Sequence, residues 1–160
     1  PSGIILKMNS IQDPEMIDLL YDAGLAGVDI KLIIRGICCL IPGKPGLSDH
    51  IEGISILDRF LEHARVYYFL NGGEEKVLLS SADWMVRNLH FRIETAFPIY
   101  TPEHKKMIIE ILKIQLEDNI KARSLNHLTI NQFRKNNSGR KMRSQLETYK
   151  YLKKRNVDFI

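Results

Sequence analysis

Two arginines and a histidine stand beside predicted strands, at places where a buried strand does not require charge. Arg35 follows an apolar run that ends at Ile34. His63 and Arg65 are two residues apart on what reads as a strand, so they share one face and place an imidazole beside a guanidinium. An arginine fork can hold two phosphate oxygens at once, and an imidazole near neutral pH can attack phosphorus or transfer a proton. These residue types indicate a phosphate site. The plainer alternatives are a structural ion pair at Arg35 and a structural histidine at His63.

Two further clusters could complete such a site. Ser81 and Asp83 follow a predicted strand, where a hydroxyl and a carboxylate can orient an imidazole or contact a phosphate. Arg92 and Glu94 are two residues apart on another predicted strand, so Arg92 could form a further phosphate fork that Glu94 holds in place. A plain turn and a cross-strand salt bridge are the alternatives. We expect these groups to converge with His63 on one edge of a sheet, where Asp83 would orient His63.

The elements that must position these residues alternate along the chain, which predicts an α/β fold with a mixed β-sheet flanked by helices. We expect strands at residues 4–8, 28–34, 65–70, 76–80 and 91–99, with a short unassigned segment around residues 54–57. Helices should begin at Asp13-Pro14, at Thr101-Pro102 and at a Ser144-x-x-Glu147 capping box. The turn Asn71-Gly72-Gly73 predicts a hairpin, and the apolar run at 28–34 predicts a central strand buried on both faces.

Length and composition favour one globular domain. The chain has 160 residues, of which 44% are hydrophobic and 26% charged, enough to bury a core. No apolar stretch is long enough to span a bilayer, and no signal peptide is evident. Cys38 and Cys39 are adjacent, so neither a disulfide framework nor a zinc site is indicated. We therefore expect a cytoplasmic protein. A strand that begins so close to Pro1 also suggests a fragment of a longer chain.

Positive charge gathers at the end of the chain. Residues 121–160, here called the basic tail, carry 11 Lys and Arg against 2 Asp and Glu, whereas residues 1–120 carry 12 against 17. A basic segment favours polyanions such as phosphate chains or nucleic acid, and a solvated basic face is the alternative. Few aromatic side chains lie between these charges, so the basic tail offers few rings on which the bases of a single-stranded nucleic acid could stack.

Several ordered strings carry a resemblance to a known family. His63-x-Arg65, followed by Ser80-Ser81-Ala82-Asp83, is similar to the two motif halves of the phospholipase D superfamily, but Arg, Ser and Asp replace its Lys, Gly and Asn. Those replacements disfavour a phosphodiesterase. Over nearly its whole length the chain resembles the C-terminal domain of bacterial polyphosphate kinase instead. The strings that carry this resemblance are residues 7–10, 34–40, 42–48, 59–63, 80–85, 87–89, 92–94 and 143–145.

The resemblance implies a phospholipase D-like domain over residues 1–160, the C-terminal catalytic domain of a longer kinase. Such a kinase reversibly transfers the terminal phosphate of ATP to inorganic polyphosphate, with Mg²⁺, through a phosphohistidine in the preceding domain. The isolated chain should then be inactive. Arg35 and His63 match positions that contact the ATP phosphates, with His63 the catalytic side chain, and Arg92 matches a further phosphate-binding arginine. Supporting roles fall to Arg65, Ser81, Asp83 and Glu94, and no metal ligand is assigned in this chain.

The resemblance also implies partners and leaves two alternatives. We expect ATP or ADP, polyphosphate, the preceding domains and further copies of the full-length enzyme as partners, and no nucleic acid. The full-length enzyme would be cytoplasmic, with peripheral membrane association left open. One alternative is a phospholipase D-like phosphodiesterase or nuclease half-site that uses His63 as nucleophile. The other is a non-enzymatic module that binds polyanions or nucleic acid through the basic tail.

Overall fold

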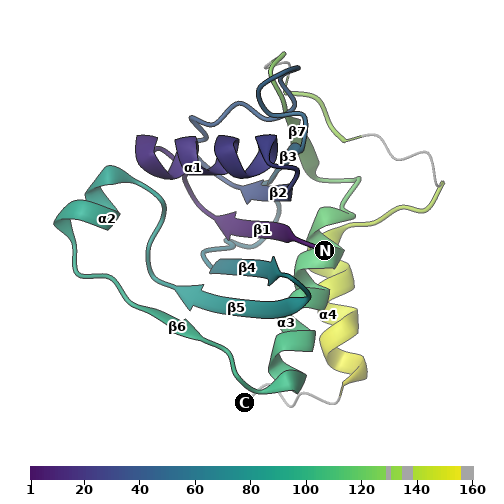
Figure 1. The fold of residues 1–160 in the computed structure, drawn as a ribbon. Coiled ribbons are helices and arrows are strands. Elements are labelled where there is room, and N and C mark those ends of the chain that lie inside the picture. Colours follow the sequence, from purple (N-terminus) through teal and green to yellow (C-terminus); the bar gives the residue numbers. More distant parts are fainter. Residues whose placement is uncertain (129–130, 135–138, 156–160) are drawn as a thin grey trace.

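The computed structural model describes residues 1–128, 131–134 and 139–155. A seven-stranded sheet in the order β6-β5-β4-β1-β2-β3-β7 forms its centre (Figure 1). The strands are β1 (Gly3–Met8), β2 (Asp29–Ile34), β3 (Ile51–Ile56), β4 (Arg65–Asn71), β5 (Glu74–Ser80), β6 (Ala96–Pro98) and β7 (Ala122–Leu125). The helices are α1 (Pro14–Leu25), α2 (Val86–Phe91), α3 (Pro102–Leu116) and α4 (Ser144–Lys154). The predicted α/β class with a mixed sheet is confirmed.

Strand direction brings several strand ends to one edge of the sheet. β1, β2 and β3 run parallel, and the last residues of β1 and β2, Met8 and Ile34, pair with each other. β4 runs antiparallel to β1, with Val66 opposite Lys7, so β4 begins where β1 ends. β5 runs antiparallel to β4 and ends beside its first residue. The carboxyl ends of β1, β2 and β5 therefore meet the start of β4.

Helices cover both faces of the sheet (Figure 1). The core on one face joins α1, through Ile17 and Leu20, to side chains of β1 and β2 such as Leu6 and Leu32. The core on the other face joins α3, through Ile109 and Leu112, to side chains of β2, β3, β4 and β5. α4 packs beside α3. A sheet covered on both faces explains why the central strand reads as a nearly continuous apolar run.

Two of the predicted local signals are confirmed in detail. Asp13 precedes Pro14, and its side chain accepts a hydrogen bond from the backbone N–H of Met16, which caps α1. The β4–β5 hairpin turns through Gly72 and Gly73, whose φ angles are 59° and 94°. Both angles are positive, a conformation that glycine adopts at little cost.

The strand predicted over residues 91–99 is wrong in extent. α2 occupies Val86–Phe91, and only Ala96–Pro98 pair with β5, as β6. Phe91, Ile93 and Phe97 mimic the alternation of a half-buried strand, but all three are exposed, Ile93 by 103%. Alternating apolar residues indicate a buried strand face only where another element covers that face. Among the described residues, no element covers Phe91, Ile93 and Phe97.

The predicted capping box of α4 is also wrong. Arg143 occupies the cap position, and the backbone N–H of Ser144 donates to Asp118 Oδ2 at 2.7 Å. A fully buried carboxylate 26 residues earlier therefore caps this helix. β7 was not expected, because its four residues show no clear alternation. Part of the basic tail, residues 129–130, 135–138 and 156–160, lies outside the described residues.

No helix within the described ranges is both long enough and apolar enough to cross a membrane.

Candidate functional site

Five polar residues at one edge of the sheet form a connected group, here called the sheet-edge site. Asn9 follows β1, Arg35 follows β2, Arg65 begins β4, His63 lies two residues before it, and Asp83 lies three residues after β5. The predicted convergence of Arg35, His63, Arg65 and Asp83 on one sheet edge is confirmed by the hydrogen bonds that link them through Asn9.

Asp83 is the centre of this group. Its Oδ1 accepts hydrogen bonds from the backbone N–H groups of Asn9 (2.8 Å) and Ser10 (3.3 Å) and from Arg65 Nε (3.2 Å). Its Oδ2 accepts from Arg65 Nη2 at 3.0 Å, and Asn9 Nδ2 lies 3.2–3.3 Å from both oxygens. Asp83 thus ties the loop after β1 to the start of β4.

The same contacts set the protonation state of Asp83. Burial raises the pKa of this carboxyl, but the hydrogen bonds and charge of Arg65, together with the N–H donors of Asn9, outweigh burial and leave the pKa below its usual value. Asp83 is therefore ionised at neutral pH. Its charge neutralises that of Arg65, whose side chain is only 13% exposed.

Arg35 keeps an uncompensated charge. Its Nε and Nη2 both donate to Asn9 Oδ1, at 3.0 and 2.7 Å. An amide oxygen orients the guanidinium but carries no net charge to neutralise it. Within the part of the chain that the structure describes, Arg35 forms no ion pair, and its side chain is partly exposed at the sheet edge. Arg35 is therefore a positioned cation that can receive an anion.

The predicted position of His63 on a strand is wrong, because His63 lies in the loop that precedes β4. The predicted proximity to Arg65 holds: Arg65 Nη1 lies 3.0 Å from both His63 Nδ1 and the His63 carbonyl oxygen. A guanidinium can only donate, so Nδ1 must accept in this geometry. The imidazole is then neutral and carries its proton on Nε2, which makes Nε2 a hydrogen-bond donor on an exposed ring.

Asp83 reaches His63 only through Arg65. The hydrogen bonds of Asp83 go to Asn9, Ser10 and Arg65, so an orientation of His63 by Asp83 would act through Arg65. Arg65 uses Nε, Nη1 and Nη2 on Asp83 and His63 and has little capacity left for a phosphate. This arrangement agrees with a supporting position for Arg65.

Ser81 and Glu94 form a separate cluster. Ser81 Oγ donates to one oxygen of Glu94, and Asn88 Nδ2 donates to the other at 2.6 Å. These two hydrogen bonds hold the pKa of Glu94 below its usual value. Glu94 therefore anchors the segment after α2 to the end of β5, and the expected pairing with Arg92 on one strand face is wrong. Arg92 is exposed and makes no hydrogen bond or ion pair with other described residues.

Asn9 is the residue that the analysis of the sequence did not single out. It links Arg35 to Asp83 and so joins both halves of the sheet-edge site. Its position directly after a predicted strand, beside the strand that ends before Arg35, is the signal that could have identified it.

The sheet-edge site does not fit a metal ion. Across the described residues, no three His, Cys, Asp or Glu side chains gather at a spacing that would hold one. Asp83, the one carboxylate of the site, receives N–H donors on both oxygens. What remains open to a ligand is the Arg35 guanidinium and the His63 Nε2–H, a pair of donors suited to phosphate oxygens.

The chain matches a family model and several known proteins. Residues 1–145 match the family model described as polyphosphate kinase C-terminal domain 2. Polyphosphate kinase from Halalkalibacterium halodurans is 56% identical over 144 residues, which are 89% of this chain and 20% of that protein. Polyphosphate kinase from Escherichia coli is 48% identical over 153 residues, 96% of this chain. The chain thus spans only 22% of the Escherichia coli protein.

Two solved structures are similar in fold. Polyphosphate kinase from Porphyromonas gingivalis has a TM-score of 0.93 and 47% identity, and the match covers 96% of this chain and 24% of that one. Nuc from Salmonella typhimurium, a phospholipase D family member, has a TM-score of 0.58 and 17% identity over 78% of this chain and 82% of that one. The second likeness concerns the fold alone, and it confirms the predicted phospholipase D-like architecture.

Proposed function

This chain belongs to the polyphosphate kinase family, and we propose that it is one domain of an ATP:polyphosphate phosphotransferase, in which it binds the phosphates that are transferred. The observation that carries the proposal is the pair of open donors at the sheet-edge site. Arg35 is held by a neutral amide and so keeps its charge, and Arg65 holds His63 with its Nε2–H outward. Both groups can bind non-bridging phosphate oxygens without competition from an internal carboxylate.

Phosphoryl transfer depends mainly on positioning and charge neutralisation. In the proposed reaction a histidine in the preceding domain of the longer polypeptide attacks the terminal phosphorus of ATP, and ADP leaves with the electrons of the broken P–O bond. The resulting phosphohistidine then passes its phosphoryl group to the terminal oxygen of polyphosphate. Arg35 would hold oxygens of the transferred group, His63 Nε2–H would donate to one of them, and Arg92 would bind the chain beyond.

Mg²⁺ belongs to the proposal only as a companion of ATP. The described residues do not offer it a ligand set, so we assign its ligands to the nucleotide phosphates and to other domains. What the ion supplies is neutralisation of phosphate charge. This chain's own share is to orient the phosphates through Arg35 and His63.

A phospholipase D-like phosphodiesterase is the second candidate, because the fold likeness to Nuc supports the architecture it needs. Its nucleophile would be His63 Nε2. The hydrogen bond from Arg65 to Nδ1 places the ring proton on Nε2, which removes the lone pair that must attack phosphorus. Hydrolysis of bis(p-nitrophenyl) phosphate by this chain, lost in His63→Ala, would favour the phosphodiesterase instead.

The test of the proposal separates binding from synthesis. Isothermal titration calorimetry should detect weak binding of tripolyphosphate to the 160-residue chain. The same chain, given ATP, Mg²⁺ and a polyphosphate primer, should show no chain growth, because the proposed nucleophilic histidine lies outside it. ATP-dependent chain growth by this chain would contradict the placement of the nucleophile, and absence of tripolyphosphate binding would contradict the phosphate site itself.

A further inference from the structure

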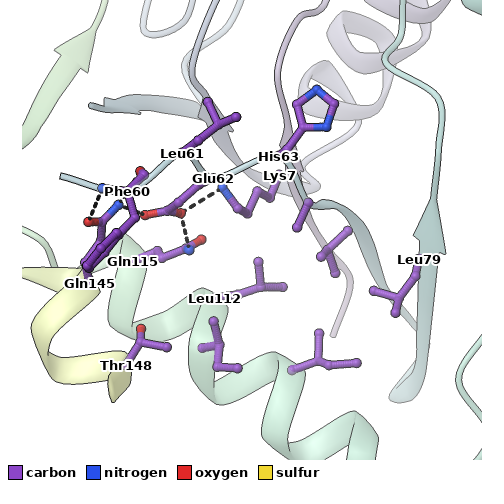
Figure 2. Close-up of a pocket in the computed structure, with 14 residues that line it drawn as sticks. Lys7, Phe60, Leu61, Glu62, His63, Leu79, Leu112, Gln115, Gln145 and Thr148 are labelled. Carbon is purple, nitrogen blue, oxygen red and sulfur yellow. Dashed lines mark hydrogen bonds and ion pairs between the residues drawn. The ribbon is translucent and has the colours of Figure 1, made fainter. Parts of the chain in front are cut away.

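A cavity of about 470 Å³ lies between the sheet and helices α3 and α4, and His63 is the one member of the sheet-edge site that lines it (Figure 2). Its volume falls within the range of small-molecule sites, roughly 300–1,000 Å³. Most of its wall is apolar and comes from the loop before β4, from β4 and β5 and from α3: Phe60, Leu61, Ala64, Val66, Leu79, Ile108, Ile111 and Leu112. Such a wall suits an apolar ring or branched chain.

One end of the cavity is polar, and its groups are arranged around Glu62. Lys7 Nζ forms an ion pair with Glu62 at 3.0 Å, with both side chains largely buried. Gln115 Nε2 donates to Glu62 at 2.7 Å, and Gln145 Nε2 donates to it at 3.0 Å. The charges of Lys7 and Glu62 cancel, so the cavity offers no net charge to attract an ion.

The remaining atom of this cluster is an acceptor without a donor. Gln115 is only 6% exposed, and within the described part of the chain nothing donates to its Oε1. The amide cannot be turned the other way, because the Glu62 carboxylate needs the Nε2–H that it now receives. Figure 2 shows Gln115 below Glu62, on the wall that Leu112 continues. A buried acceptor left unpaired is costly, so a ligand that supplies a donor gains from pairing it.

We propose that this cavity is a binding site for a small uncharged molecule with an apolar ring body and a single N–H or O–H group, which donates to Gln115 Oε1. The apolar wall takes the ring, and the neutral ion pair beside the acceptor disfavours a charged ligand. Of the sheet-edge site the cavity reaches only His63, since Arg35 and Asp83 do not line it.

A ligand in the cavity can act on His63, and this link is here called the route to His63. His63 lines the cavity itself and follows Glu62 directly in the chain (Figure 2). A ligand that pairs with Gln115 therefore touches the loop that positions the imidazole, and it should change the affinity for phosphate. This second part rests on the proposed function, whereas the binding site itself does not.

Indole and 1-methylindole test the site, because they share a ring body and differ by the one donor. Their binding to the chain is measured by the NMR shifts of the methyl groups of Leu79, Ile108 and Leu112. Indole should bind about tenfold more tightly than 1-methylindole, the worth of one hydrogen bond to an otherwise unpaired acceptor. Gln115→Met should abolish the difference. Gln145→Met, which also removes a hydrogen bond to Glu62 but leaves Gln115 Oε1 in place, should retain it.

Each outcome decides the inference. Absence of methyl shifts, equal affinity for the two probes, or a preference that survives Gln115→Met would overturn the binding site. A tripolyphosphate titration with and without saturating indole then tests the route to His63. A phosphate affinity that changes at least about twofold supports the route, whereas an unchanged affinity refutes the route and leaves the indole site standing. If tripolyphosphate does not bind even without indole, the proposed function fails and the cavity is judged on the indole pair alone.

Discussion

Asp83→Asn should destabilise the chain strongly, because the substitution removes the one charge that compensates a largely buried guanidinium. Asn keeps an oxygen in the place of Oδ1 and so retains the bonds from the backbone of Asn9 and Ser10. Its NH₂ group replaces Oδ2 and meets Arg65 Nη2, a donor that now lies 3.0 Å from Oδ2. Breaking a buried ion pair from one side costs roughly 3–5 kcal/mol, and because some hydrogen bonds are retained we expect a loss of about 3 kcal/mol.

The loss should depend on pH in a stated direction. The pKa of Asp83 is lowered in the folded chain, so its carboxylate contributes stability at every pH above its unfolded pKa of about 3.9. That contribution disappears as pH falls through the lower folded pKa. The difference in unfolding free energy between wild type and Asp83→Asn should therefore be full at pH 7 and shrink steadily in acid.

Urea unfolding followed by circular dichroism, from pH 7 down to pH 3, measures both quantities. Asp29→Asn is the matched control, since Asp29 is 62% exposed and its 3.6 Å ion pair with Lys31 lies on the surface. That variant should stay within about 0.5 kcal/mol of wild type. An Asp83→Asn variant as stable as Asp29→Asn at pH 7, or a difference that grows in acid, would refute the reasoning.

Substitutions at Arg35, His63 and Gly53 test the site and the fold. Arg35→Lys keeps the charge but loses the planar fork, and calorimetry should show tripolyphosphate affinity falling about tenfold; unchanged affinity would mean that charge alone suffices. His63→Ala should weaken tripolyphosphate binding about tenfold, whereas His63→Gln, whose amide N–H replaces the Nε2–H, should retain most of it; equal losses would argue against a donor role. Gly53→Ala places a Cβ 2.9 Å from Pro42 Cγ and should cost about 1–3 kcal/mol in urea unfolding, whereas Gly3→Ala, with its nearest contact at 3.5 Å, should cost little. Equal effects of the two glycine substitutions would contradict the close contact between β3 and Pro42.

The central part of the fold could be predicted from the sequence because its signals are local. The apolar run of β2, the hairpin glycines and the Asp13-Pro14 helix start each act through neighbouring residues. The α4 cap and β7 could not be predicted in this way. Asp118 caps α4 from 26 residues away, and β7 exists because β3 offers it a partner, not because its own residues alternate.

The candidate site, like the fold, could be predicted only in part. That Arg35, His63, Arg65 and Asp83 would meet was predicted because each lies near the end of a predicted strand, where ligands of α/β sheets collect; the strand order of the structure brings those ends to one edge. Apart from the contact between His63 and Arg65, the contacts among these side chains were not predicted, because they depend on the loops. The loop before β4 turns His63 toward Arg65, and Asn9 takes the position between Arg35 and Asp83. Arg92 follows a helix that periodicity did not reveal.

The most direct test of the phosphate site is a ³¹P NMR titration of ATP and medium-chain polyphosphate with this chain, with short duplex DNA as competitor. The double variant Arg35→Ala/His63→Ala removes both open donors. His104→Ala/Lys106→Ala is the control, since it removes one histidine and one cation from the exposed surface of α3. The account predicts that wild type and control bind phosphate chains, that the Arg35/His63 variant does not, and that DNA competes poorly. Equal binding by all three proteins, with strong competition by DNA, would assign the binding to the basic tail and contradict the sheet-edge site.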